Sequence, residues 1–177
     1  MNALPPPPRD TKDWTWVLDR PCPECGFNST DFDRDDFADR IDDTVNFWRA
    51  RLAADDVRIR PEITIWSPLE YGCHIRDALA VFDQRFALML SQDDAHFDDW
   101  DPDQAALTGE YPLQNPRTVA GQIAVHGAAV SERLRSMRPE DWNCTGSRSN
   151  GSLFTVDSLA RYLLHDLIHH EWDVDVS

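Results

Sequence analysis

Three histidines have the residue type and the spacing to bind one divalent metal ion. His165 and His169 are four residues apart, and residues four apart lie on the same face of a helix. Two imidazoles on one face can reach a single ion at the roughly 2.0–2.1 Å of a zinc–nitrogen bond. A third imidazole must come from elsewhere in the chain, and His74 is the natural choice. Three neutral nitrogens leave a coordination position open for water or substrate, as in a catalytic site.

The neighbours of this set have simpler interpretations. His170 could replace His169 if the end of the helix rotates, but a spacing of five from His165 is less favourable, so we expect it near a ligand or at the surface. Asp166 and Asp173 are expected to be solvated or to accept hydrogen bonds. The histidine pair alone is weak evidence for a metal, because such pairs also occur on solvated helix faces and at core edges.

Cys22 and Cys25 belong to a second motif, CPECG, which has the shape of a zinc-knuckle turn. A closed structural site needs four ligands, and Cys73 and Cys144 could complete it only by converging in space. The alternatives are a plain turn with reduced thiols and a redox pair, although a redox pair normally accompanies a βαβ unit. We expect this turn to be independent of the histidine set, and Cys73 to be a small buried hydrophobe.

Four stretches have the apolar periodicity of amphipathic helices. They cover roughly residues 33–54, 67–89, 115–137 and 155–172. The second stretch has the clearest start, with Ser67 as N-cap, Pro68 at the first helical position and Glu70 three residues after the cap. His74 lies on the flank of its apolar stripe. The sequence therefore predicts that His74 points toward the interior or its rim.

These helices predict an all-α four-helix bundle, in which metal sites are built from inward-facing side chains of facing helices. Residues 91–114 are long enough to be a crossover between non-adjacent helices or a loop over a site. A short hairpin is expected around Asn150 and Gly151. We divide the chain into residues 1–30, an irregular leader with the CxxC motif, and residues 31–177, the bundle. Residues 1–9 are proline-rich and expected to be poorly ordered.

Composition excludes several classes of partner. The 177 residues carry a formal net charge of −15, which disfavours nucleic acid and anionic membranes because both attract clustered Lys and Arg. No stretch approaches the roughly 18 apolar residues of a membrane span, and the first residues lack the layout of a secretory signal. Four cysteines are too few for a secreted disulfide framework. These features predict a cytoplasmic protein.

The segments WSPLEYGCHIRDAL and LARYLLHDLIHHEWDV together resemble the DinB-like superfamily, over about residues 31–173. This superfamily includes the metal-binding domain of mycothiol-dependent maleylpyruvate isomerases and the bacillithiol transferases. The resemblance implies an up-down-down-up bundle. It also implies a metal bound by one histidine of the second helix and a pair on the fourth, which correspond to His74, His165 and His169.

The resulting hypothesis is a metal-dependent enzyme that uses a low-molecular-weight thiol, such as mycothiol or bacillithiol, against an electrophilic substrate. An open zinc or nickel ion would lower the pKa of a bound thiol, as it does for water. A metal-dependent hydrolase is the chemical neighbour of this hypothesis. The alternative from another class is a metal-binding or stress-response module without turnover. The thiol-binding surface would come from this domain or from the partner in a homodimer.

Overall fold

The computed structural model describes Pro7 and residues 12–176. Apart from Pro7, the expectation for residues 1–9 lies outside the described residues. Among the helices of the described part, none combines the length and the apolar character that a membrane crossing requires.

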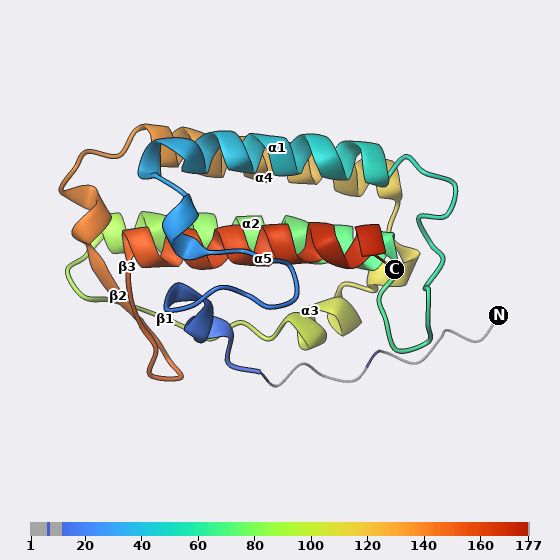
Figure 1. Cartoon of the computed structure of the whole chain (residues 1–177), viewed down its shortest axis with the longest axis horizontal. Coiled ribbons are helices and arrows are strands. Elements are labelled where there is room, and N and C mark those ends of the chain that lie inside the picture. The colour runs from blue at the N-terminus through green and yellow to red at the C-terminus, as the bar shows by residue number, and fades with distance from the viewer. Residues whose placement is uncertain (1–6, 8–11, 177) are drawn as a thin grey trace.

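Four long helices form a bundle: α1 (Phe37–Arg51), α2 (Pro68–Ser91), α4 (Pro116–Arg135) and α5 (Val156–Val176). Figure 1 shows α1 and α5 running in one direction along the bundle and α2 and α4 in the other. Each of α1 and α2 packs against both α4 and α5. The helices α1 and α4 approach closely where α4 has Gly127, since a Cβ there would lie 2.3 Å from a methyl carbon of Val45.

Two helix starts follow the predicted capping chemistry. At the start of α2, the Ser67 hydroxyl accepts a hydrogen bond from the Glu70 backbone, and the Glu70 carboxylate accepts one from the Ser67 backbone at 2.9 Å. At the start of α4, the Asn115 side chain accepts hydrogen bonds from two backbone amides of the first turn. The capping box fixes the first residue of α2 and therefore the position of His74, two turns into the helix.

A small sheet makes the all-α expectation approximate. The strand β2 (Thr145–Arg148) pairs antiparallel with β3 (Leu153–Thr155) and parallel with β1 (Ala95–Phe97). The predicted hairpin is confirmed, and Gly151 takes the positive φ of 95° that its turn requires. The strand β1 was not predicted because three residues in an acidic connection show no usable alternation.

The connection from α2 to α4 is a loop beside the candidate site. It contains β1, a short helix α3 (Pro102–Thr108) and a 3₁₀ turn η4 (Tyr111–Leu113). The expected alternative, a crossover between non-adjacent helices, is wrong, since α2 and α4 pack together. They run in the same direction, so the connection must return along the bundle, as Figure 1 shows.

The leader packs against α5. A 3₁₀ helix η1 (Trp14–Leu18) contacts α5, and two further 3₁₀ turns, η2 (Ser29–Asp31) and η3 (Arg34–Asp36), lead into α1. Arg161 of α5 donates hydrogen bonds to the backbone carbonyls of Ser29 and Phe32 and forms an ion pair with Asp157. Cys22 and Phe27 are buried in the same core as the bundle helices. The leader is therefore attached to the last helix of the bundle.

Candidate metal centres

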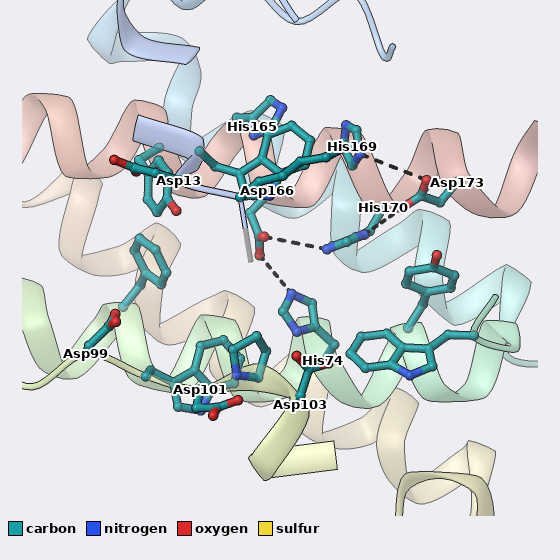
Figure 2. A pocket seen from close by; sticks show the side chains of 18 of the residues that line it. Asp13, His74, Asp99, Asp101, Asp103, His165, Asp166, His169, His170 and Asp173 are labelled. Atoms are coloured by element: carbon teal, nitrogen blue, oxygen red, sulfur yellow. Dashed lines mark hydrogen bonds and ion pairs between the residues drawn. The ribbon is translucent and has the colours of Figure 1, made fainter. Parts of the chain in front are cut away.

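The helix α5 carries two pairs of potential ligands on two different faces. His165 and His169 form one pair and Asp166 and His170 the other, each with a spacing of four. Consecutive residues are about 100° apart around a helix, so the two pairs cannot point in the same direction. In Figure 2, His165 and His169 point away from α2, whereas Asp166 and His170 point toward His74.

The first group, which we call the His/Asp cluster, consists of His74, Asp166 and His170. One ligand atom from each residue lies within 4.8 Å of the others. Nε2 of His74 is 3.2 Å from one carboxylate oxygen of Asp166, and Nε2 of His170 is 3.6 Å from the other. Ligands of one ion with bonds of about 2.1 Å lie roughly 3.4 Å apart in a tetrahedral arrangement. The cluster therefore has the dimensions of a metal site.

Charges within the His/Asp cluster are balanced by a proton on His170. Burial lowers the pKa of His170, but its interactions with Asp166 and Asp173 outweigh burial and raise the pKa to about 9. Burial raises the pKa of Asp166, but His74 and His170 hold it well below its usual value. Asp173 also accepts a hydrogen bond from His170 at 2.8 Å and interacts with the Tyr71 hydroxyl. A cation here would replace the proton on His170.

The second group, the Cys/His cluster, consists of Cys22, Cys25, His165 and His169. One ligand atom from each residue again lies within 4.8 Å of the others. The Cys22 sulfur is 3.8 Å from Nδ1 of His169. Aromatic rings cover the histidines: the Trp14 ring centroid lies 5.3 Å from that of His165 and 5.0 Å from that of His169.

The backbone of the CPECG motif forms a tight turn. The Cys22 amide donates to the Phe27 carbonyl at 2.7 Å, the Gly26 amide donates to the Cys22 carbonyl, and Gly26 has a positive φ of 74°. Burial raises the pKa of Cys25 to about 11, although a backbone hydrogen bond at Phe27 favours the thiolate. Burial, together with His169, lowers the pKa of His165 to about 4, which keeps this imidazole neutral.

One buried ring nitrogen fits the presence of an ion. Among the described residues, Nε2 of His165 is buried without a hydrogen-bond partner, and buried polar atoms in proteins are normally paired. Nδ1 of His74 is also unpaired, but the nitrogen of His74 that faces Asp166 is Nε2, so an ion in the His/Asp cluster would not pair Nδ1. The donors of both clusters are imidazole, carboxylate and thiol groups, which all bind divalent transition metals. Both donor sets therefore fit an ion.

A cavity of about 710 Å³ lies beside the His/Asp cluster. The Trp100 ring, from the connection between α2 and α4, stacks on His74 with 5.3 Å between centroids. Trp66, which precedes α2, and Tyr71 in its first turn also line the cavity, and Trp14 and Lys12 of the leader form part of its wall. The cavity is large enough for a small organic molecule next to the ligands.

Two buried arginines give one part of the cavity a positive charge. Arg85 and Arg148 are 6% and 9% exposed and both line the cavity. Burial and the nearby Arg148 lower the pKa of Arg85 to about 10. Arg148 lies 3.5 Å from Asp99, a carboxylate that is half exposed. Arg148 also helps to lower the pKa of Asp13, and other carboxylates line the cavity, so the two guanidinium groups are the cationic part of a wall of mixed charge.

The predicted three-histidine set is distributed over two groups. The structure brings His165 and His169 together but places His74 with Asp166 and His170, so the set His74, His165 and His169 stays a prediction. All four histidines line the same cavity. The physical reason for the division is the rotation of α5, whose buried residues Leu159 and Leu163 lie on the same stripe as Asp166 and His170.

One expectation for the neighbouring residues is confirmed and one is corrected. His170 was expected near a ligand or at the surface, and it lies near a predicted ligand, since its ring faces His74 with 4.7 Å between centroids. The CxxC turn was expected to be independent of the histidines, but its two cysteines lie with His165 and His169. The sequence contained a signal for this second grouping, since C-x₂-C and H-x₃-H are the two halves of a Cys₂His₂ zinc site.

The remaining cysteines do not complete the CxxC motif. Cys73 is fully buried in α2, as expected for a small hydrophobe. Within the described part of the chain, neither Cys73 nor Cys144 joins a group of potential ligands. The Cys₄ alternative therefore has no support in the geometry.

Comparisons with known proteins agree with the fold. A family model for the DinB superfamily matches residues 50–173. A structure of YfiT from Bacillus subtilis, described as a probable metal-dependent hydrolase with an unusual four-helix bundle topology, superposes with a TM-score of 0.73. The two chains are 13% identical, and the match covers 81% of this chain and 84% of YfiT. No protein with a curated description matches the chain.

Proposed function

Because the chain belongs to the DinB superfamily, we propose that it is a metal-dependent enzyme with its ion held by His74, Asp166 and His170. The observation that carries this proposal is the convergence of these three side chains, from two helices, at the wall of a cavity. A site with three protein ligands leaves a position open for water or substrate. An ion there, zinc or nickel, would lower the pKa of a bound thiol or water.

The protein residues have separate roles in this proposal. Asp173 accepts a hydrogen bond from Nδ1 of His170 and so directs Nε2 toward Asp166. The Trp100 ring covers His74 and reduces the access of water from that side. Arg85 and Arg148 would bind an anionic group of the substrate or of the thiol. We therefore expect a substrate with a carboxylate to react in preference to its methyl ester.

The leading reaction is transfer of a low-molecular-weight thiol, mycothiol or bacillithiol, to an electrophilic carbon. A metal-dependent hydrolase is the second candidate, supported by the description of YfiT. A metal-binding module without turnover is the third. The metal-loaded protein should be incubated with monobromobimane or chlorodinitrobenzene and mycothiol, bacillithiol or glutathione, and separately with carboxylate-bearing esters. Turnover with one thiol supports transfer, turnover of esters alone supports hydrolysis, and no turnover with a bound ion supports the binding module.

Adjacent histidines provide a test of the ligand set. We expect His170→Ala to lower turnover, and the affinity for the added ion, by more than about a hundredfold, since loss of groups that only support ligands already costs 10–100-fold. His169→Ala should retain turnover per folded molecule. His126→Ala is the matched control, because His126 lies on α4 in neither cluster. The opposite result, with His169 essential and His170 dispensable, would favour the predicted three-histidine set.

A further inference from the structure

The donors of the Cys/His cluster come from two segments that are distant in sequence, the CPECG turn of the leader and the last helix. We propose that Cys22, Cys25, His165 and His169 bind a structural zinc ion, separate from the ion of the proposed enzyme site. Two sulfur and two nitrogen donors are the set that tetrahedral zinc takes in closed structural sites.

The distances require only small movements to form such a site. Ligands of tetrahedral zinc lie about 3.3–3.8 Å apart, given zinc–nitrogen bonds of about 2.0 Å and zinc–sulfur bonds of about 2.3 Å. The cluster already has Cys22 and His169 at 3.8 Å and all four ligand atoms within 4.8 Å of one another. The turn that carries the two cysteines is also formed, with Gly26 in the left-handed region.

A second observation points independently to a cation. His165 is 3% exposed, and its Nε2 has no hydrogen-bond partner among the described residues. Leaving such an atom unpaired in a folded protein costs about 1–3 kcal/mol. A bond from this nitrogen to an ion beside Cys22 and Cys25 would remove that penalty.

Donor type and charge distinguish this site from the His/Asp cluster. Cys22 and His169 are 1% and 7% exposed, and Trp14 and Phe27 pack against the histidine rings. Two thiolates neutralise a divalent cation, which makes it tolerable at a largely buried position. The carboxylate of Glu24 also lies 3.5 Å from Nε2 of His169. Any proton on the two thiols leaves to solvent when the ion binds. Four protein ligands leave no position for a substrate, so the ion has a structural role.

The zinc ion would attach the leader to α5 at one point. Trp14 of the leader lines the cavity beside the His/Asp cluster. An ion in the Cys/His cluster would therefore hold one wall of that cavity in place without touching the substrate.

X-ray absorption at the zinc edge tests the proposal on the full-length chain. The experiment should use the His170→Ala variant, in which the enzyme site is disabled, so that the signal comes from the Cys/His cluster alone. We expect one zinc per chain with two sulfur neighbours at about 2.3 Å and two nitrogen neighbours at about 2.0 Å. A zinc ion with only nitrogen and oxygen neighbours would overturn the assignment. A Cys22–Cys25 disulfide without zinc, seen by mass spectrometry under non-reducing conditions, would also overturn it.

Variants provide a second measurement. The double variant Cys22→Ser, Cys25→Ser should lose this zinc, whereas Cys144→Ser, a cysteine outside the cluster, should keep it. His169→Cys retains four ligands and should hold zinc with three sulfur neighbours. Full zinc content in the double variant would contradict the site. If the double variant does not fold, the sulfur count in His170→Ala decides, and it does so whether or not the enzyme proposal holds.

Discussion

The two clusters share one helix and differ in almost every other property. The Cys/His cluster is buried under aromatic rings and has soft sulfur donors, and its His165 stays neutral. The His/Asp cluster lines the same cavity but has a carboxylate among its donors, and it carries a proton on His170 without an ion. The comparison teaches that the same spacing of four residues can serve two chemistries, and that the other donors brought to each pair decide which.

The largest expected effect concerns the aromatic cover of the Cys/His cluster. Phe27 is buried, with its ring edge-on to His165 at 5.4 Å. Phe27→Ala should lower the free energy of unfolding by about 3 kcal/mol, measured in urea, because it leaves a cavity. Hydrogen exchange in residues 12–32 should rise, and ion affinity at the His/Asp cluster should change little.

Phe97→Ala is the matched control, since Phe97 is a buried phenylalanine in β1, outside both clusters. It should destabilise the protein without a selective increase of exchange in the leader. Equal rates of hydrogen exchange in residues 12–32 of the two variants would contradict this prediction. The Cys/His cluster would then not hold the leader in place.

An intermediate effect is expected at the other cluster. Tyr71 interacts with Asp173, which orients His170. Tyr71→Phe should lower ion affinity at the His/Asp cluster by about tenfold, the lower end of the range for groups that orient a ligand. Titration of the metal-depleted protein measures this. Tyr111→Phe removes another buried tyrosine hydroxyl, which is bonded to Asp77 and touches neither group of ligands, and it should leave affinity unchanged.

The smallest expected effect concerns the stability that ion pairs give to the starts of α2 and α5. Glu70, at the start of α2, is paired with Arg60, and Asp157, at the start of α5, with Arg161 and Arg34. Burial raises the pKa of both carboxyls, but it is outweighed at Asp157 by the two arginines and at Glu70 by Arg60 and hydrogen bonds from Ser67, so both pKa values are lowered. A lowered pKa means that the stability is present above the unfolded value, near pH 4, and is lost as pH falls through the folded value.

Urea unfolding between pH 6 and pH 3 should therefore show a loss of stability below about pH 4.5. Glu70→Gln should reduce this loss by on the order of 1 kcal/mol, the net value of a buried hydrogen bond. Asp157→Asn should reduce it by less, because its Arg34 partner is partly exposed. If Glu70→Gln lost as much free energy of unfolding at low pH as the unsubstituted protein, this pair would not stabilise the start of α2.

Much of the bundle could be predicted from the sequence because local signals determine it. Ser67 and Asn115 mark the starts of α2 and α4 by capping chemistry, and the turn at Gly151 marks the hairpin. The strand β1 could not be predicted, because its pairing with β2 joins segments about fifty residues apart. Nothing in three consecutive residues encodes such a partner.

The division of the histidines between the two clusters was harder to predict from the sequence, because it depends on how α5 is rotated about its own axis. A spacing of four occurs twice in α5, in His165/His169 and in Asp166/His170. The angular positions of these residues around the helix do not by themselves favour either pair as metal ligands. Only packing against α2 and the leader selects which pair faces His74. That His74 belongs to a group of potential ligands was predictable, since its flank position follows from the start of α2.

The contact between the leader and α5 also sets an order of events during synthesis. Cys22 and His169 are 147 positions apart. At about 5–20 residues per second, roughly 7–30 s separate their addition to the growing chain. Throughout that interval both cysteines are exposed thiols without their histidine partners, open to oxidation or to other metals. A reducing environment during that interval would keep both thiols available for the histidines of α5.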